Sequence, residues 1–380
     1  MNISYGKQSI DKKDIKHVVS ALKKDFLTQG PLVEKFETQL KLKLNSKYAT
    51  VVNNGSSALL AVGKILNWIP GDFIAVSPIT FLSSVNVVEH CGATPIFVDI
   101  NLKDYSRDPK ALESILQKDK KKKIRAAIIT DYGGQTAQWS EFRRLKRKYK
   151  ITLINDNCHA LGSVYNNDYG YAVKYADFVT LSFHPVKAIT TGEGGAILTN
   201  NLAFDRKAKL FRTHGIERSA NQHWKYKMNI LGYNLRLPDL NCALGISQIK
   251  KLKKFIKKRQ EIAIFYNNMF NNNIKFTIPA NIKNNKNSYH LYPLFMNLEM
   301  IKKKKNQIIN EFLKQNIKVQ VHYIPVNTQP FYKKKYGFNK KDFPNSMTFY
   351  ENTISLPIYY DLNLQKLNYI KKVCKKIFNF

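Results

Sequence analysis

The stretch LSFHPVKAITTGEGGAILTN, residues 181–200, has apolar runs on both sides of a glycine-rich loop. The runs 178–184 and 194–200 have the length and composition of strands, so we expect a β-hairpin around the loop. The loop carries one lysine, Lys187, in a chain of 380 residues with 62 Lys and Arg. A lysine in a setting so poor in charge can be held deprotonated by desolvation, which makes its amine a nucleophile. The alternative interpretation is an ordinary surface lysine.

Upstream of this hairpin, short apolar runs alternate with helical patterns. Such alternation predicts an α/β fold with a mixed, mostly parallel sheet whose faces are covered by helices. The runs rich in Val, Ile and Leu are typical of strands buried on both faces. The expected strands are 48–54, 72–78, 94–100, 125–131 and 151–157, and the expected helices are 57–66, 83–92 and 140–150.

The pattern changes near residue 245. Residues 246–270 have apolar side chains at helical spacing and predict one long amphipathic helix. Shorter mixed elements follow to the end of the chain. We therefore expect two units: an N-terminal arm with a large domain over 1–245, and the long helix with a small α+β domain over 246–380.

The net charge of +35, from 62 basic and 27 acidic residues, is the strongest compositional signal. Such a charge is compatible with a nucleic-acid or other anionic partner. The basic runs 118–125 and 301–307 nevertheless lie far apart and contain no interleaved aromatic residues. We interpret them as solvated faces and expect no specific nucleic-acid partner. A basic binding module without catalysis is kept as an alternative.

Other features favour a cytoplasmic protein. No apolar run approaches the ~20 residues that a membrane-spanning helix needs, so we expect no membrane association. The four cysteines form no CxxC pair, so neither a disulfide framework nor a metal site is expected. These cysteines are Cys91, Cys158, Cys242 and Cys374.

Residues 53–57, NNGSS, join an expected strand to an expected helix. The backbone N–H groups of Gly55, Ser56 and Ser57, the serine hydroxyls and the positive helix end would together bind an anion such as a phosphate. Ser182, near the end of the first hairpin strand, could add a hydroxyl to the same site. The alternative interpretation is an ordinary helix cap.

Asp156 ends the apolar strand 151–157. Open α/β sheets bind ligands at the carboxyl ends of their strands. A carboxylate there can keep a pyridine nitrogen protonated, which makes the ring an electron sink. The alternative is a turn residue after the strand. With Lys187 and the phosphate loop, Asp156 indicates a cofactor that carries both an aldehyde and a phosphate.

An ordered set of motifs extends this pattern over most of the chain. The motifs are FLTQGPLVEKFE (26–37), VVNNGSSALLA (51–61), SPITFLSSVNVVEHCGATPIFVDI (77–100), INDNCHALG (154–162), the stretch 181–200, GYNLRLPDLNCALGISQI (232–249) and VQVHYIPVNTQPFY (319–332). Together they resemble the DegT/StrS family of sugar aminotransferases. The resemblance implies pyridoxal 5′-phosphate as cofactor and the aspartate-aminotransferase-like fold, fold type I.

The resemblance also implies roles for single residues. Lys187 would bond covalently to the cofactor, and Asp156 would pair with its ring nitrogen. His159 would pack near the ring and its hydroxyl group, and Phe81 would stack on the ring face. Ser56, Ser57 and Ser182 would contact the phosphate, and Asn234 would reach the phosphate of a partner subunit, which implies a homodimer with shared active sites.

A finer resemblance is to the subgroup that makes pseudaminic acid precursors. It implies amination at C4 of a UDP-linked 4-keto-6-deoxy-2-acetamido sugar, with L-glutamate as donor. Substrate contacts would then come from Tyr5, Leu27, Thr28, Gln29, Gly30, His322, Tyr323, Ile324 and Pro325. The sequence departs from the family pattern at Asn155, Asn157, Leu235, Pro238 and Asn241. Another nucleotide sugar, such as a dTDP- or GDP-linked 4-keto-6-deoxyhexose, is therefore kept as an alternative.

Overall fold

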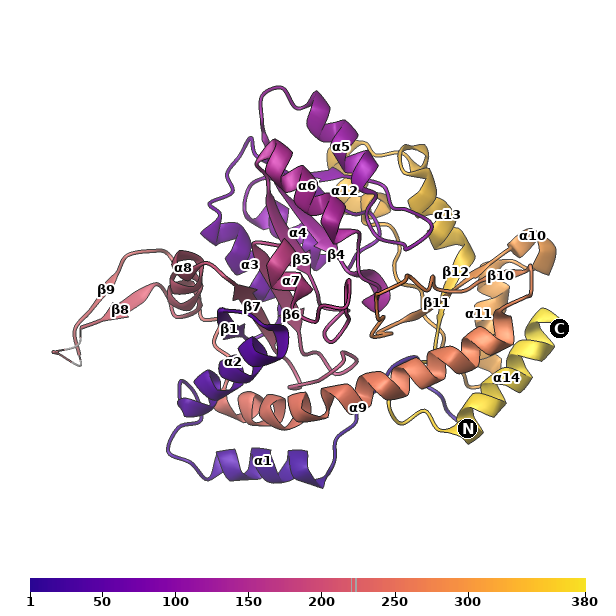
Figure 1. The fold of residues 1–380 in the computed structure, drawn as a ribbon, viewed down its shortest axis with the longest axis horizontal. Coiled ribbons are helices and arrows are strands. Elements are labelled where there is room, and N and C mark those ends of the chain that lie inside the picture. Colours follow the sequence, from indigo (N-terminus) through magenta and orange to yellow (C-terminus); the bar gives the residue numbers. More distant parts are fainter. Residues whose placement is uncertain (220, 223) are drawn as a thin grey trace.

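A central sheet of seven strands organises the protein. The computed structural model describes residues 1–219, 221–222 and 224–380 (Figure 1). The strand order is β1-β7-β6-β5-β4-β2-β3. These strands are β1 (Tyr48–Val52), β2 (Phe73–Val76), β3 (Thr94–Phe97), β4 (Ile124–Thr130), β5 (Thr152–Asp156), β6 (Phe178–Ser182) and β7 (Gly195–Thr199).

The pairing confirms the predicted mixed, mostly parallel sheet. β3, β2, β4, β5 and β6 run parallel to one another, whereas β7 is antiparallel to both β6 and β1. The expected hairpin around Lys187 is the β6–β7 pair, in which Ser182 lies opposite Gly195. The parallel strands β4, β5 and β6 therefore present their last residues at one edge of the sheet.

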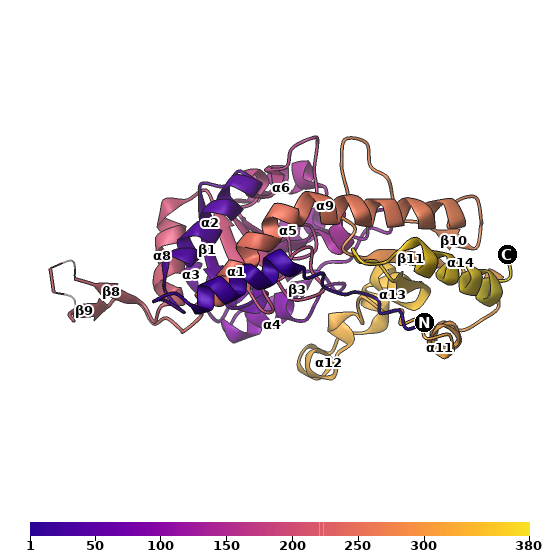
Figure 2. The ribbon, with the colours of Figure 1, turned by 90° about the horizontal axis from the view of Figure 1, so that it is seen from below.

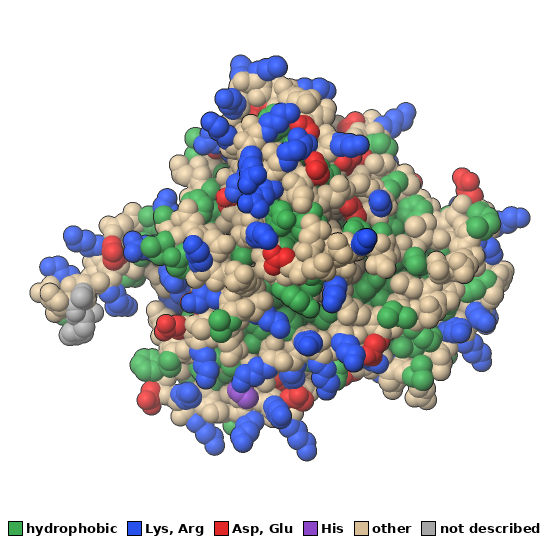
Figure 3. Space-filling view, viewed as in Figure 1, with side chains coloured by type: hydrophobic (Ala, Val, Ile, Leu, Met, Phe, Trp, Pro, Cys, Tyr) green, Lys and Arg blue, Asp and Glu red, His purple; other side chains and the backbone are tan. Residues whose placement is uncertain are grey.

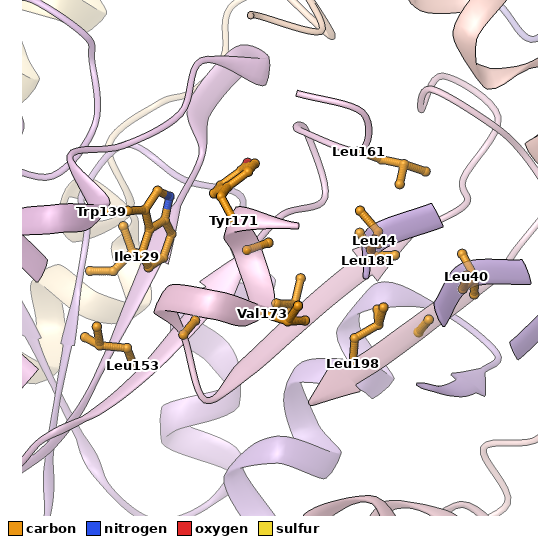
Figure 4. Packing of buried hydrophobic residues seen from close by; sticks show 14 of the residues in the cluster. Leu40, Leu44, Ile129, Trp139, Leu153, Leu161, Tyr171, Val173, Leu181 and Leu198 are labelled. Carbon is orange, nitrogen blue, oxygen red and sulfur yellow. The ribbon is translucent and has the colours of Figure 1, made fainter. Parts of the chain in front are cut away.

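Helices cover both faces of the sheet. Successive side chains of a strand point to opposite faces, so they enter different cores. On β7, for example, Leu198 enters one core and Ile197 enters the other. The first core contains residues of α2 (Pro31–Leu44), α5 (Pro109–Lys118), α6 (Trp139–Tyr149), α7 (Tyr171–Tyr175) and the first half of α9 (Asp239–Phe270). Figure 4 shows part of this packing, with Trp139 and Tyr171 among the strand side chains. The second core contains residues of α3 (Gly55–Ile65), α4 (Ser83–His90) and α8 (Leu202–Arg212).

The helix α9 runs from the large sheet to a smaller C-terminal unit (Figures 1 and 2). It has 32 residues and begins at Asp239 rather than at the expected residue 246. Residues from Cys242 to Ile256 pack in the first sheet core, whereas those from Ile262 to Phe270 pack in the C-terminal core. α1 (Lys12–Leu22) packs along α9. The domain boundary at 245/246 stays a prediction.

The C-terminal unit has a three-stranded antiparallel sheet in the order β10-β11-β12. Its core includes Phe312 of α11 and Ile370 of α14, together with Ile3 of the N-terminal segment. The elements are β10 (Phe276–Thr277), β11 (Tyr292–Met296), α10 (Leu298–Ile301), α11 (Lys305–Lys314), α12 (Pro330–Tyr336), α13 (Pro344–Asn352), β12 (Thr353–Leu356) and α14 (Leu364–Phe378).

A hairpin of β8 (Ile216–Arg218) and β9 (Tyr226–Met228) projects away from the body of the protein in both ribbon views (Figures 1 and 2). Tyr226 and Met228 are exposed on it, and Leu231 is exposed just after it. Apolar side chains so far from either core contribute nothing to the packing of this chain.

Basic side chains spread over the whole visible face, from α5 at the top to α1 at the bottom (Figure 3). Lys120 to Lys123 of the first basic run are exposed, as expected of a solvated face. The second run differs from that interpretation, because Lys303 and Lys305 are partly buried. Lys303 donates to Glu311 and to the carbonyl of Ile377, both at 2.8 Å. Among the described residues, no helix is long and apolar enough to cross a membrane.

Candidate active site

A cavity of about 640 Å³ opens at the carboxyl edge of the parallel strands. Thr130, Asp156 and Ser182, the last residues of β4, β5 and β6, all line it. The other lining residues are Tyr5, Asn54, Gly55, Ser56, Thr80, Phe81, Ser83, Cys158, His159, His184, Val186, Lys187, Glu193, His290, Gln320, Val321, His322 and Tyr323. The fold thus brings residues from both ends of the chain to the edge where open α/β sheets bind ligands.

The first turn of α3 forms one end of the cavity. Asn54 caps the helix by accepting a hydrogen bond from the N–H of Ser57 at 2.8 Å. Gly195 has to be glycine here, because a Cβ atom on it would lie 2.4 Å from the carbonyl oxygen of Asn54. The glycine-rich loop therefore lets β7 approach the start of α3 closely. N–H groups in a first turn lack partners within the helix, so Gly55 and Ser56 present an anion-binding end to the cavity.

Asp156 is held on the cavity side of β5. Its side chain is buried and accepts hydrogen bonds from the Ser84 hydroxyl at 2.7 Å and from the Cys158 N–H at 3.2 Å. Ser84 lies in the first turn of α4, and its hydroxyl lies 3.3 Å from that of Thr80. Two donors on one carboxylate hold it in place and restrict its rotation. The carboxylate is therefore preorganised to face a cationic group.

The neighbours of Asp156 point to the other side of the strand. Asn155 and Asn157 both donate side-chain N–H groups to the buried carboxylate of Asp131, at 3.1 and 3.0 Å. Asp131 also accepts hydrogen bonds from Ala137 N–H, Trp139 Nε1 and Tyr171 Oη. Burial nevertheless raises the pKa of Asp131 to about 6. Asn155 and Asn157 are two of the departures from the family pattern. Their hydrogen bonds to Asp131 hold the end of β5 on the side opposite Asp156.

Lys187 lies across the cavity on the loop between β6 and β7. The backbone N–H of Lys187 donates to the carbonyl of His184 at 2.9 Å. The backbone N–H of Thr191 donates to the carbonyl of Phe183, also at 2.9 Å, and the two hydrogen bonds hold the loop in shape. Desolvation lowers the pKa of the Lys187 ammonium, against the opposing effect of Cys158 and Asp156. A depressed pKa provides the neutral amine that a nucleophilic lysine needs.

A set of aromatic and imidazole rings forms the wall opposite the helix end. The N–H of Gly133 donates to His159 Nδ1 at 3.3 Å, so the neutral ring carries its proton on Nε2. Nε2 lies 3.0 Å from the hydroxyl of Tyr323 and donates to it, which leaves the Tyr323 O–H free to donate elsewhere. Burial is the main cause that lowers the pKa of His159 well below its ordinary value. Phe81 is 55% exposed, and its ring centroid lies 5.9 Å from that of Tyr323.

Several predicted site residues lie outside the cavity in this chain. Gln29 and Gly30 line a separate cavity of about 350 Å³ with Arg212 and Arg236, and the Gly30 N–H donates to Asp239 at 2.8 Å. Asn234 is exposed and pairs with the backbone of Thr213. The remaining residues outside the lining of the Lys187 cavity are Leu27, Thr28, Ser57, Ile324 and Pro325.

Sequence reasoning missed Ser84 and His290. Ser84 follows Phe81 at the start of a helix on the correct edge of the sheet, and this position was a usable signal. His290 precedes β11 and is buried in the cavity wall, with its ring centroid 4.4 Å from that of His159. Its pKa is lowered well below the ordinary value, mainly by burial. Only an isolated histidine before an apolar run marked it in the sequence.

The fold and this cavity define a class of protein: an α/β enzyme with a lysine, a strand-end carboxylate and a helix N-terminus in one cavity. The model of the DegT/DnrJ/EryC1/StrS aminotransferase family matches residues 8–377. The chain belongs to this family. The resemblance found in the motifs is therefore confirmed, and with it the expectation of an aminotransferase.

Two solved structures and one relative illustrate the similarity. Helicobacter pylori PseC, an aminotransferase involved in the biosynthesis of pseudoaminic acid, superposes with a TM-score of 0.92 at 32% identity, covering 100% of both chains. A sugar aminotransferase from Streptococcus pneumoniae in its PLP-form has a TM-score of 0.90 at 26% identity, covering 100% of this chain and 99% of its own. The UDP-4-amino-4,6-dideoxy-N-acetyl-beta-L-altrosamine transaminase of Campylobacter jejuni (strain 81-176) is 39% identical over 370 residues, 97% of this chain and 96% of the relative.

Proposed function

We propose that the protein is a pyridoxal-phosphate-dependent transaminase of nucleotide sugars. It transfers the amino group of L-glutamate to C4 of a UDP-linked 4-keto-6-deoxy-2-acetamido sugar, and the product enters pseudaminic acid or a similar surface glycan. The observation that carries the proposal is the meeting of Lys187, Asp156 and the first turn of α3 in one cavity. The similarity to PseC and to the Campylobacter transaminase supports the choice of sugar.

The residues of the cavity fit pyridoxal phosphate. The phosphate would bind at Gly55, Ser56 and Ser182, which line the cavity, with the hydroxyl of Ser57 as a further contact just outside the lining. Asp156 would pair with the ring nitrogen, with His159 near the ring hydroxyl and Phe81 against the ring face. When bound, the cofactor supplies an aldehyde that bonds to amines and a ring that accepts electrons from the adjacent carbon.

Lys187 carries the proton transfers. As a neutral amine it removes the proton from Cα of glutamate, and as an ammonium group it delivers a proton to C4 of the sugar in the second half of the reaction. The carboxylate of Asp156, held by Ser84 and Cys158, would face positive charge on the bound group. The walls formed by His159, His290 and Tyr323 exclude water and so preserve the neutral amine.

The nucleotide sugar would enter past Tyr5, His322 and Tyr323, with Ile324 and Pro325 adjoining. Tyr5 and His322 lie with their ring centroids 5.4 Å apart at the cavity wall. The 27–30 segment and Asn234 lie outside this cavity, and a homodimer would explain both. In it, the partner subunit's Asn234 would complete the phosphate site. We expect the enzyme to act in the cytoplasm, where nucleotide sugars and glutamate occur together.

The test is an amination assay with purified enzyme, L-glutamate and a panel of UDP-, dTDP- and GDP-linked 4-keto sugars, read by mass spectrometry. We expect the C4 amine of the UDP-linked 2-acetamido sugar as the preferred product. Preference for a dTDP- or GDP-linked sugar would keep the transaminase and reject this substrate. No amination of any sugar by a protein that binds the cofactor would reject the proposed function.

A further inference from the structure

Arg259 is a buried cation that bonds only to backbone carbonyls in the structure. It lies on α9 and is 3% exposed. Its Nη1 donates to the carbonyls of Ile358 at 2.9 Å, His290 at 3.1 Å and Tyr289 at 3.2 Å. Its Nη2 donates to the carbonyl of Val186 at 3.3 Å. Burial lowers its pKa to about 10, so the guanidinium stays charged at neutral pH.

These carbonyls belong to different walls of the candidate active site. Val186 directly precedes Lys187, and both line the cavity, as His290 does. Ile358 follows β12, and its N–H donates to the carbonyl of Tyr5, another lining residue, at 3.0 Å. One side chain therefore connects the lysine loop with the segments before β11 and after β12, although Arg259 itself does not line the cavity.

Arg259 also adjoins a space that Lys187 lines. Arg259 and Lys187 both line a second, very small cavity of about 10 Å³. Such a space is hardly large enough for one water molecule. Desolvation, and not the charge of Arg259, is the cause that lowers the pKa of Lys187. A fixed positive charge in a buried setting still disfavours a second cation nearby. The charge of Arg259 is accordingly among the causes that lower the pKa of His290, after burial and the charges of His159 and Lys187.

We propose that Arg259 is a positioning residue that holds the Lys187 loop against the His290 wall and keeps water away from the Lys187 amine. The role rests on the proposed function in one respect, namely that Lys187 is the reactive amine. Arginine suits this role because its planar fork directs several N–H donors at once, whereas a lysine ammonium is a compact charge on a flexible stem. α9 thereby acts as a rigid support for the active site.

The test measures Lys187 itself, in the cofactor-free protein. A small acylating reagent is applied over a range of pH, and the rate of Lys187 labelling is followed by peptide mass spectrometry. The midpoint of the rate profile reports the pKa of the amine. In Arg259→Lys and Arg259→Met we expect this midpoint to rise by about one pH unit or more, because water and a looser loop restore the charged form.

The matched control is Tyr266→Phe. Tyr266 lies on the same helix, is buried, and donates to the carbonyl of Pro357 at 2.8 Å, next to Ile358. Its loss removes a buried hydrogen bond without touching the lysine loop, so thermal stability should fall while the Lys187 midpoint stays unchanged. An equal midpoint shift in the control would overturn the proposal, because general loosening would then be the cause.

Other outcomes are equally decisive. A folded Arg259→Lys protein with the midpoint of the wild type would overturn the positioning role. If neither Arg259 variant folds, as judged by circular dichroism, Arg259 serves global stability and the proposal also fails. The sugar assay is separate from this measurement. A raised midpoint without amination of any sugar would reject the proposed function alone, and normal amination with an unchanged midpoint would reject this inference alone.

Discussion

Lys187 supplies the amine of the proposed reaction, and desolvation in the cavity lowers the pKa of that amine. Lys187→Ala should abolish amination, because no other amine stands at that point of the cavity to take the proton from the donor. Reduction of the holoenzyme with borohydride should attach the cofactor to the wild type and not to this variant. The matched control is Lys305→Ala, since burial lowers the pKa of Lys305 to about 8, and Lys305 lies on α11, in the C-terminal unit. Covalent attachment that survives in Lys187→Ala would assign the bond to another lysine.

Substitutions of Asp156 and Ser84 should lower kcat to different extents. Asp156→Asn removes the charge that keeps a ring nitrogen protonated, and we expect kcat to fall by about 10²–10⁴-fold with cofactor still bound. Ser84→Ala removes one hydrogen bond at 2.7 Å and leaves the charge in place, so the fall should be about tenfold. Steady-state kinetics with saturating cofactor compare the two. A larger loss in Ser84→Ala than in Asp156→Asn would contradict the assigned order.

The end of the strand β5 is held by a buried carboxyl group behind it. Asp131 accepts hydrogen bonds from both Asn155 and Asn157, and burial raises its pKa to about 6. The pKa of an unfolded Asp is about 4. Because the folded value is the higher one, the contribution of Asp131 to stability is present below pH ~4 and is lost as the pH rises through about 6.

Asp131→Asn tests this expectation. The free energy of unfolding of the wild type, taken relative to this variant, should fall by about 2 kcal/mol between pH 4 and pH 7. Urea titrations of both proteins at several pH values measure the difference. A difference that does not change with pH would mean that the carboxylate is ionised throughout this range, held by its donors despite burial.

The whole molecule is expected to work as a pair of chains. Asn234 is exposed here, and the β8–β9 arm extends beyond the body of one chain with apolar side chains on it (Figure 1). Inactive Lys187→Ala and Asn234→Ala proteins should recover activity when their subunits exchange, because one site of each hybrid dimer is intact. Random exchange would restore about a quarter of wild-type activity. Full activity in a protein that sediments as a monomer would exclude shared sites.

Local sequence signals were enough to predict several parts of the fold and of the site. Apolar periodicity located the sheet strands, and the glycine-rich loop between two apolar runs placed Lys187 in a hairpin. Asp156 and the 53–57 segment were found in the same way, since a strand end or a helix start is marked by its immediate neighbours. The motif order then identified the family. These features need no knowledge of distant contacts.

The side chains that complete the site from distant parts of the chain are known from the folded structure and from no local pattern. Ser84 reaches Asp156 across 72 residues of sequence, and Arg259 reaches Val186 across 73. No periodicity encodes such pairs, because they arise when parallel strands align their ends and α9 packs beneath the lysine loop. The same packing separated Gln29 and Gly30 from the cavity in which the resemblance had placed them. Hydrogen bonds and desolvation act over a few ångströms, so the chemistry of Lys187 depends on residues that meet only in the folded chain.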